Sequence, residues 1–133
     1  MRYLIFLFLL LPVLGFASDM PQTILDQQSE INRDILKAYQ DLASARHELR
    51  TQRQLSALDS QYRSRGSLPA DNKVPDAVRE VRQCEERIAD LERRKGNLKI
   101  DAAKYYEGKL PVSFLKSWDE EEQAHRERTG KYQ

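Results

Sequence analysis

The side chains that could perform covalent or metal chemistry are few and widely spaced in this sequence of 133 residues. It contains one cysteine, Cys84, and two histidines, His47 and His125, neither of which has a neighbour at metal-ligand spacing. A structural zinc site requires four placed ligands, and a phosphate loop requires a glycine-rich motif that is absent here. The carboxylates at 85–86 and 120–122 are typical of a solvated helix face. The sequence therefore predicts a protein that is not an enzyme and has no catalytic, cofactor-binding or metal-binding residues.

Cys84 lies among apolar positions of a helical pattern and not among the charged positions. One interpretation is a small side chain packed between helices, because free cysteine is readily buried. The alternative is an intermolecular disulfide, which an unpaired cysteine suggests in an exported protein. We prefer the first interpretation, because burial hides the sulfur and raises the pKa of a thiol. The sequence therefore predicts that Cys84 stays reduced and reacts poorly.

Residues 1–17 have the pattern of a secretory signal peptide. Arg2 precedes an apolar run over 3–14, and the small residues Gly15 and Ala17 occupy the −3 and −1 positions of a cleavage site. A membrane-spanning helix requires about 20 apolar residues, so this run is short for an anchor. The alternative is an uncleaved signal that tethers the protein to a membrane. We expect an exported protein, either periplasmic or secreted.

Charge is balanced over the whole chain but uneven along it. Removal of Arg2 with the signal leaves 21 basic and 21 acidic residues, from the 22 and 21 of the full sequence. This balance argues against a nucleic-acid partner, because such binders carry a basic excess. Residues 46–82 nevertheless hold eight basic and five acidic side chains. They suit either contact with an acidic partner or lipid headgroups or, as the plainer interpretation, a solvated helix face.

A heptad pattern covers residues 74–107. Apolar side chains recur at spacings of three and four, and only Lys95 among them is polar. Such alternation over several heptads is typical of a coiled-coil helix. The positions are Val74, Ala77, Val81, Cys84, Ile88, Leu91, Lys95, Leu98, Ala102 and Tyr105.

A pattern of the same kind covers residues 22–63, approximately. The alternation of apolar residues is regular as far as Leu49 and then slips by one place, to Leu55, Leu58 and Tyr62. A slip of this kind locally distorts the supercoil of a coiled coil. The sequence thus predicts a second long helix whose last turns do not follow the pattern of the rest.

The segment 64–73 separates the two patterns and has the strongest turn composition in the chain. It predicts an all-α protein in which residues 18–107 form an antiparallel helical hairpin, packed as a coiled coil. A reversal near residue 70 would place Leu55 beside Cys84.

The tail, residues 108–133, is predicted to be a short helix that is partly disordered behind its first turns. Phe114, Leu115 and Trp118 cluster at its start, and few apolar residues follow them. These side chains could cap the end of the hairpin by packing on the two tyrosines at 105–106. They could instead form an exposed anchor for a partner, because tryptophan is enriched at binding hot spots.

Two helical segments without a reactive constellation indicate a non-enzymatic coiled-coil protein that acts as a scaffold in the cell envelope. Its partners would be other proteins or further copies of itself. A periplasmic holdase-type chaperone, which grips clients between helical arms, is one alternative. The other is a membrane-tethered envelope linker, which requires that the signal be retained.

We expect the signal to be cleaved between Ala17 and Ser18, because the apolar run is short and the small residues define a cleavage site. Intact-mass analysis of the protein from the exported fraction should give the mass of residues 18–133. A chain that retains residues 1–17 and remains with the membranes would contradict this expectation.

Overall fold

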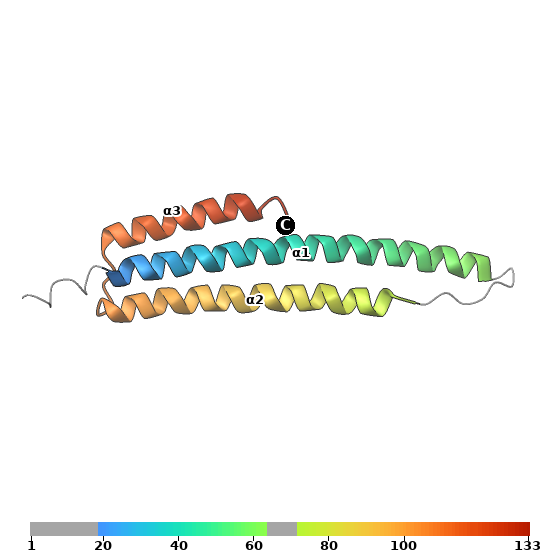
Figure 1. Cartoon of the computed structure of the whole chain (residues 1–133), viewed down its shortest axis with the longest axis horizontal. Helices are drawn as coiled ribbons and strands as arrows, with labels where there is room; N and C mark the ends of the chain where they lie inside the picture. Colours follow the sequence, from blue (N-terminus) through green and yellow to red (C-terminus); the bar gives the residue numbers. More distant parts are fainter. Residues whose placement is uncertain (1–18, 64–71) are drawn as a thin grey trace, which may run out of the picture.

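The computed structural model describes residues 19–63 and 72–133, which form three helices and no strand. They are α1 (Asp19–Arg63), α2 (Val74–Tyr105) and α3 (Val112–Thr129). Figure 1 shows an elongated molecule in which α2 and α3 each lie along α1. The predicted signal peptide, 1–17, and most of the predicted turn lie outside the described residues. Within those residues, no helix is both long and apolar enough to cross a membrane.

The helix directions follow from the contacts between side chains. Arg46 pairs with Glu85 at 3.3 Å and Arg87 pairs with Asp41 at 3.8 Å, so α2 runs antiparallel to α1. The predicted all-helical hairpin is therefore present. On the other side of α1, Gln28 contacts Trp118 and Asn32 contacts Glu121. Residue numbers rise together in the two helices, so α3 runs parallel to α1.

Local sequence explains where α2 begins. The side-chain oxygen of Asn72 accepts a hydrogen bond from the backbone N–H of Val74 at 3.2 Å. Pro75 stands in the first turn, where its missing N–H has no intrahelical partner to lose. These residues start the helix, and the heptad pattern then carries it to Tyr105.

The middle of the hairpin is held together by a narrow apolar cluster. Its buried members share a face of α1 or of α2, and the half-buried Tyr39, Val81, Cys84 and Leu98 pack around them. Each large apolar side chain buried here contributes about 1.5–3 kcal/mol. The buried members are Ile31, Ile35, Ala38, Leu42, Ile88 and Leu91.

The register of the hairpin differs from the predicted one. Cys84 lies beside Ala45, about three turns of α1 before Leu55, so the predicted pairing of Cys84 with Leu55 is wrong. Loop-closure entropy rises only slowly with loop length, so the shortest turn does not decide the register. Burial decides it, because this alignment brings Ile24 of α1 against Ala102 of α2 in a second apolar cluster.

As a consequence, α1 continues past the start of α2 (Figure 1). We call residues 53–62 the projecting end of α1. Every side chain in it is exposed except that of Asp59, which is half-buried. The slip in the apolar pattern thus coincides with the loss of the facing helix.

The chain turns sharply between α2 and α3. Glu107 and Gly108 have φ angles of 53° and 80°, and the N–H of Gly108 donates to the carbonyl of Ala103 at 2.7 Å. Glycine takes this left-handed conformation without the steric cost that other residues bear. Pro111 then precedes the first residue of α3 and prevents α2 from continuing.

The tail differs from the partly disordered segment that the sequence predicts. The helix α3 extends from Val112 to Thr129, and its late residues His125 and Thr129 are buried. The prediction was based on the number of apolar residues, whereas the second half of α3 is anchored mainly by polar side chains.

Replacement of Leu91 by Asp should lower the free energy of unfolding by about 3–5 kcal/mol, because it places an unpaired charge in the hairpin cluster. Asn97→Asp is the matched control, since it adds the same charge at an exposed position of the same helix. Thermal unfolding followed by circular dichroism measures both. Equal midpoints for the two variants would contradict the assignment of the buried face.

Candidate interaction surfaces

The aromatic side chains at the start of α3 close the end of the hairpin. Phe114 and Trp118 are only 3% and 4% exposed and pack with Ile24 and Ala102. The ring of Phe114 lies 6.4 Å from that of Tyr106 and 5.9 Å from that of Trp118, measured between centroids. The structure thus has the self-capping arrangement.

These side chains are not available as the exposed partner anchor that the sequence allowed. Leu115, the third member of that predicted anchor, is half-buried. The ammonium group of Lys99 lies 5.7 Å from the centre of the Trp118 ring and covers it further. These side chains are covered because α3 folds back along α1 and its first two turns bury their apolar side chains there.

Two buried amides of α1 hold α3 in place. Gln28 donates from its side chain to the backbone carbonyl of Trp118 at 3.1 Å. Asn32 donates from its side chain to the Glu121 carboxylate at 3.2 Å. The oxygens of both amides are buried and accept no hydrogen bond from the described residues. Such groups are costly to bury, so they restrict the positions in which α3 can pack.

A partly buried ion pair joins α3 to α2. The ammonium group of Lys95 lies 3.1 Å from the Glu122 carboxylate and 3.2 Å from that of Glu92. Lys95 is buried, which is rare for lysine without such partners. If α3 packed elsewhere, Glu122 would no longer face Lys95, and the buried lysine charge would be poorly compensated. The pair therefore favours this one position of α3.

His125 lies buried beside this ion pair. Its Nδ1 atom finds no hydrogen-bond partner among the described residues. Burial, followed by the nearby charge of Lys95, lowers the pKa of His125 below its usual 6.5, against the opposing charges of Glu122 and Glu92. The imidazole is therefore neutral at physiological pH.

Sequence reasoning missed this polar interface under α3. A signal was present, because Gln28 and Lys95 interrupt the apolar positions of the two heptad patterns. A polar residue in such a position often specifies how helices associate. The sequence did not indicate that a third helix would supply the partners.

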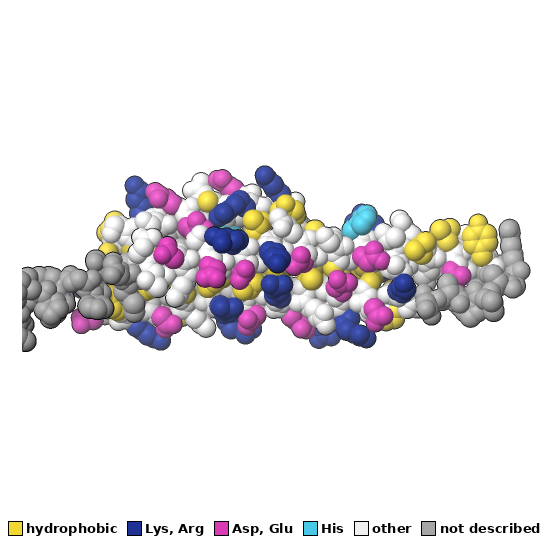
Figure 2. Space-filling view, in the orientation of Figure 1, with side chains coloured by type: hydrophobic (Ala, Val, Ile, Leu, Met, Phe, Trp, Pro, Cys, Tyr) yellow, Lys and Arg dark blue, Asp and Glu magenta, His cyan; other side chains and the backbone are white. Residues whose placement is uncertain are grey.

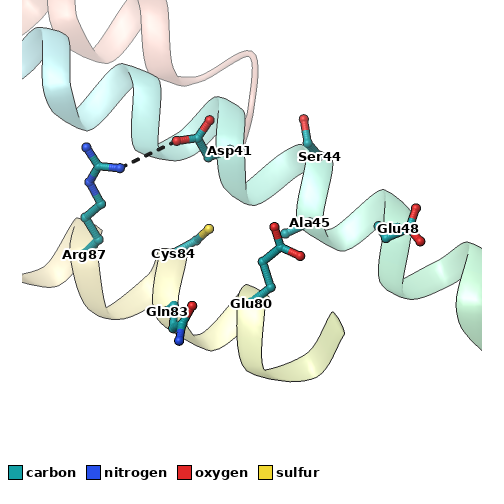
Figure 3. A pocket seen from close by; sticks show the side chains of 8 residues that line it. All are labelled: Asp41, Ser44, Ala45, Glu48, Glu80, Gln83, Cys84 and Arg87. Atoms are coloured by element: carbon teal, nitrogen blue, oxygen red, sulfur yellow. Dashed lines mark ion pairs between the residues drawn. The ribbon is translucent and has the colours of Figure 1, made fainter. Parts of the chain in front are cut away.

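Cys84 is half-buried and points toward α1 from the wall of an open groove of about 640 Å³ between the two helices (Figure 3). Partial burial raises the pKa of its thiol, and the carboxylates of Asp41, Glu80 and Glu85 raise it further, against the effect of Arg87. The thiol therefore stays protonated at physiological pH. That Cys84 forms no intermolecular disulfide stays a prediction.

An apolar stripe lies on the projecting end of α1. Leu55, Leu58 and Tyr62 are 53%, 50% and 58% exposed. At 100° per residue they stand about 140–160° around α1 from Leu42, which faces α2. Figure 2 shows hydrophobic side chains gathered over these last turns. The stripe is directed away from the hairpin cluster.

A second feature, where the projecting end begins, is a hollow of about 470 Å³ with three arginines in its wall. We call it the arginine hollow. Arg46 has an exposed ion pair with Glu85, whereas Arg50 and Arg53 are exposed and pair with no carboxylate among the described residues. Its lining consists of Arg46, Leu49, Arg50, Arg53, Gln54 and Ala57.

Among the described residues, no group of three or more His, Cys, Asp or Glu side chains is placed to hold a metal ion. No protein-family model matches the chain, and neither curated proteins nor solved structures give a match. The surfaces of the projecting end are therefore interpreted from their own geometry and charge.

The position of His125 predicts a loss of stability in mild acid. The unfolded chain takes up a proton near pH 6.5, whereas the folded chain takes it up only at lower pH, so unfolding is favoured as the pH falls below 6.5. The thermal midpoint should fall between about pH 7.5 and 5.5 by a few degrees. His125→Gln should flatten this dependence.

The matched control is His47→Gln, because His47 is exposed on α1 and its replacement changes no buried contact. It should retain the pH dependence of the original chain. An unchanged slope in His125→Gln, or an equal change in both variants, would show that other groups control the response.

Proposed function

We propose that this protein is a non-enzymatic interaction protein that is exported to the cell envelope and acts there as a scaffold. Its hairpin is proposed to be an antiparallel coiled coil, on the basis of the heptad positions that form the apolar cluster. Export rests on the signal-like pattern of residues 1–17.

The observation that carries this proposal is the projecting end of α1. A helix that continues beyond its neighbours, with Leu55, Leu58 and Tyr62 half-exposed or more, presents apolar surface that no other described residue buries. Exposed apolar patches on soluble proteins commonly mark contacts with a partner. The other end is closed by α3, so partner binding is assigned to the projecting end.

The same stripe also favours the second candidate, a holdase-type chaperone. An exposed apolar surface at the end of an arm could hold unfolded clients instead of a single partner. The two functions differ in selectivity, since a scaffold binds defined partners and a holdase binds many unfolded chains. A tethered linker would use the same end and differ only by retaining residues 1–17.

Site-specific photo-crosslinking in the exporting cell tests the proposal. A photoreactive amino acid at Leu58 should give one or a few adducts of defined mass, because this side chain lies in the apolar stripe. The control position is Glu120, which is exposed on α3 at the opposite end.

Absence of adducts at Leu58, or the same adducts from both positions, would contradict the scaffold function. A continuous smear of adducts, together with suppression of client aggregation by the purified protein, would replace it with the holdase function.

A further inference from the structure

The arginine hollow lies on the same side of α1 that binds α3. Arg46 and Arg50 stand 18 residues beyond Gln28 and Asn32, which at 3.6 residues per turn is about five whole turns, or about 27 Å. The contact of α3 with α1 ends near Gln40, where the side chain of Gln40 donates to the Tyr132 hydroxyl at 3.2 Å. The face of α1 that carries Gln28 and Asn32 therefore continues into the hollow, and α3 does not cover it there.

We propose that the arginine hollow is the docking site for an acidic amphipathic helix of a partner protein. This proposal rests on the proposed scaffold function. The partner helix would lie along α1 beyond the end of α3, on the face that carries Gln28 and Asn32. The half-buried Leu49 and the small Ala57 provide apolar surface in the lining. Arg46, Arg50 and Arg53 provide cations at spacings of four and three. A helix in a groove is recognised by side chains at these spacings.

Charge determines the chemistry of the occupant. Arg50 and Arg53 have no acidic partner among the described residues, and the Arg46–Glu85 pair is about half exposed on both sides. Such exposed pairs contribute little stability, so Arg46 can exchange Glu85 for another carboxylate. Carboxylates on the facing side of a partner helix would pair with all three guanidinium groups.

The chain's own α3 is a poor candidate for the role in a second copy. Two of its carboxylates already have partners, since Glu121 pairs with Arg128 at 3.0 Å and Glu122 pairs with Lys95 at 3.1 Å. Glu121 and Glu122 of a second copy would have to lose these contacts before they could pair with the arginines of the hollow.

An anionic lipid surface is also disfavoured. Residues 46–62 hold three arginines and two carboxylates, Glu48 and Asp59, which is a net charge of only +1. Clusters that bind anionic membranes by charge carry about four to eight basic residues. The hollow suits a shaped partner better than a flat charged surface.

The first experiment measures binding of a designed peptide to the full chain from residue 18 onward by fluorescence anisotropy. The probe is an amphipathic helix of about 18 residues, matched in length to five turns, with glutamates at positions i, i+4 and i+7 beside an apolar stripe. The control peptide has glutamine in place of each glutamate. We expect saturable binding of the glutamate peptide that weakens with salt, and much weaker binding of the control.

The variant Arg50→Glu/Arg53→Glu should weaken binding of the glutamate peptide about tenfold or more, because two attractive contacts become repulsive. A peptide with lysine in place of glutamate should bind this variant better than it binds the original chain. The matched control is Arg33→Glu/Arg94→Glu, which changes the net charge equally at exposed positions outside the hollow. It should bind as the original chain does.

Failure of the glutamate peptide to bind, or equal loss in both double variants, would overturn the docking site. Binding of vesicles with anionic lipid that depends on Arg50 and Arg53, without peptide binding, would overturn it in favour of a lipid contact. Partner adducts at Leu58 that persist unchanged in Arg50→Glu/Arg53→Glu would also overturn it, and would leave the scaffold function standing.

Discussion

The contact between the middle of α1 and the middle of α2 fixes the rest of the structure. Ile35 and Ala38 are fully buried there against Ile88 and Leu91, and this packing sets how far one helix is displaced along the other. The displacement brings the start of α1 to the end of α2, where α3 returns. It also leaves the projecting end of α1 without a facing helix among the described residues. A single alignment thus determines both the closed end and the open end.

The two interfaces of α1 are held together by different forces. Against α2 the contact is mainly apolar, and its strength depends on buried area. Against α3, beyond the aromatic cluster, it depends on the side chains of Gln28 and Asn32, while the Lys95–Glu122 pair joins α3 to α2. Polar contacts of this kind add little net stability but penalise other alignments. The hairpin therefore provides most of the cohesion, and the polar groups determine where α3 lies.

The two long helices and their antiparallel packing could be predicted from the heptad patterns, because an apolar stripe must be buried against another. The register could not be predicted, since residues 64–73 permit several alignments of similar loop entropy. The packing of α3 could not be predicted either. Its anchors include Gln28, His125 and Thr129, and such residues leave no periodic apolar signal. The sequence showed the arginines of the hollow as a basic excess. Only the position of α3 shows that Arg46 and Arg50 lie on the face of α1 that α3 contacts.

The projecting end is a helix maintained with little tertiary packing. Long isolated helices are marginal in water, and most helical stability in proteins comes from a packed face. Within it, the Ser60 hydroxyl donates to the backbone carbonyl of Ala57 at 2.7 Å. Continuity with the packed part of α1 also removes the cost of starting a new helix. A partner that binds this end meets a preformed surface, so less of its binding free energy is spent on ordering. The same helix is well packed where α2 and α3 cover it and is least packed where a partner is proposed to bind.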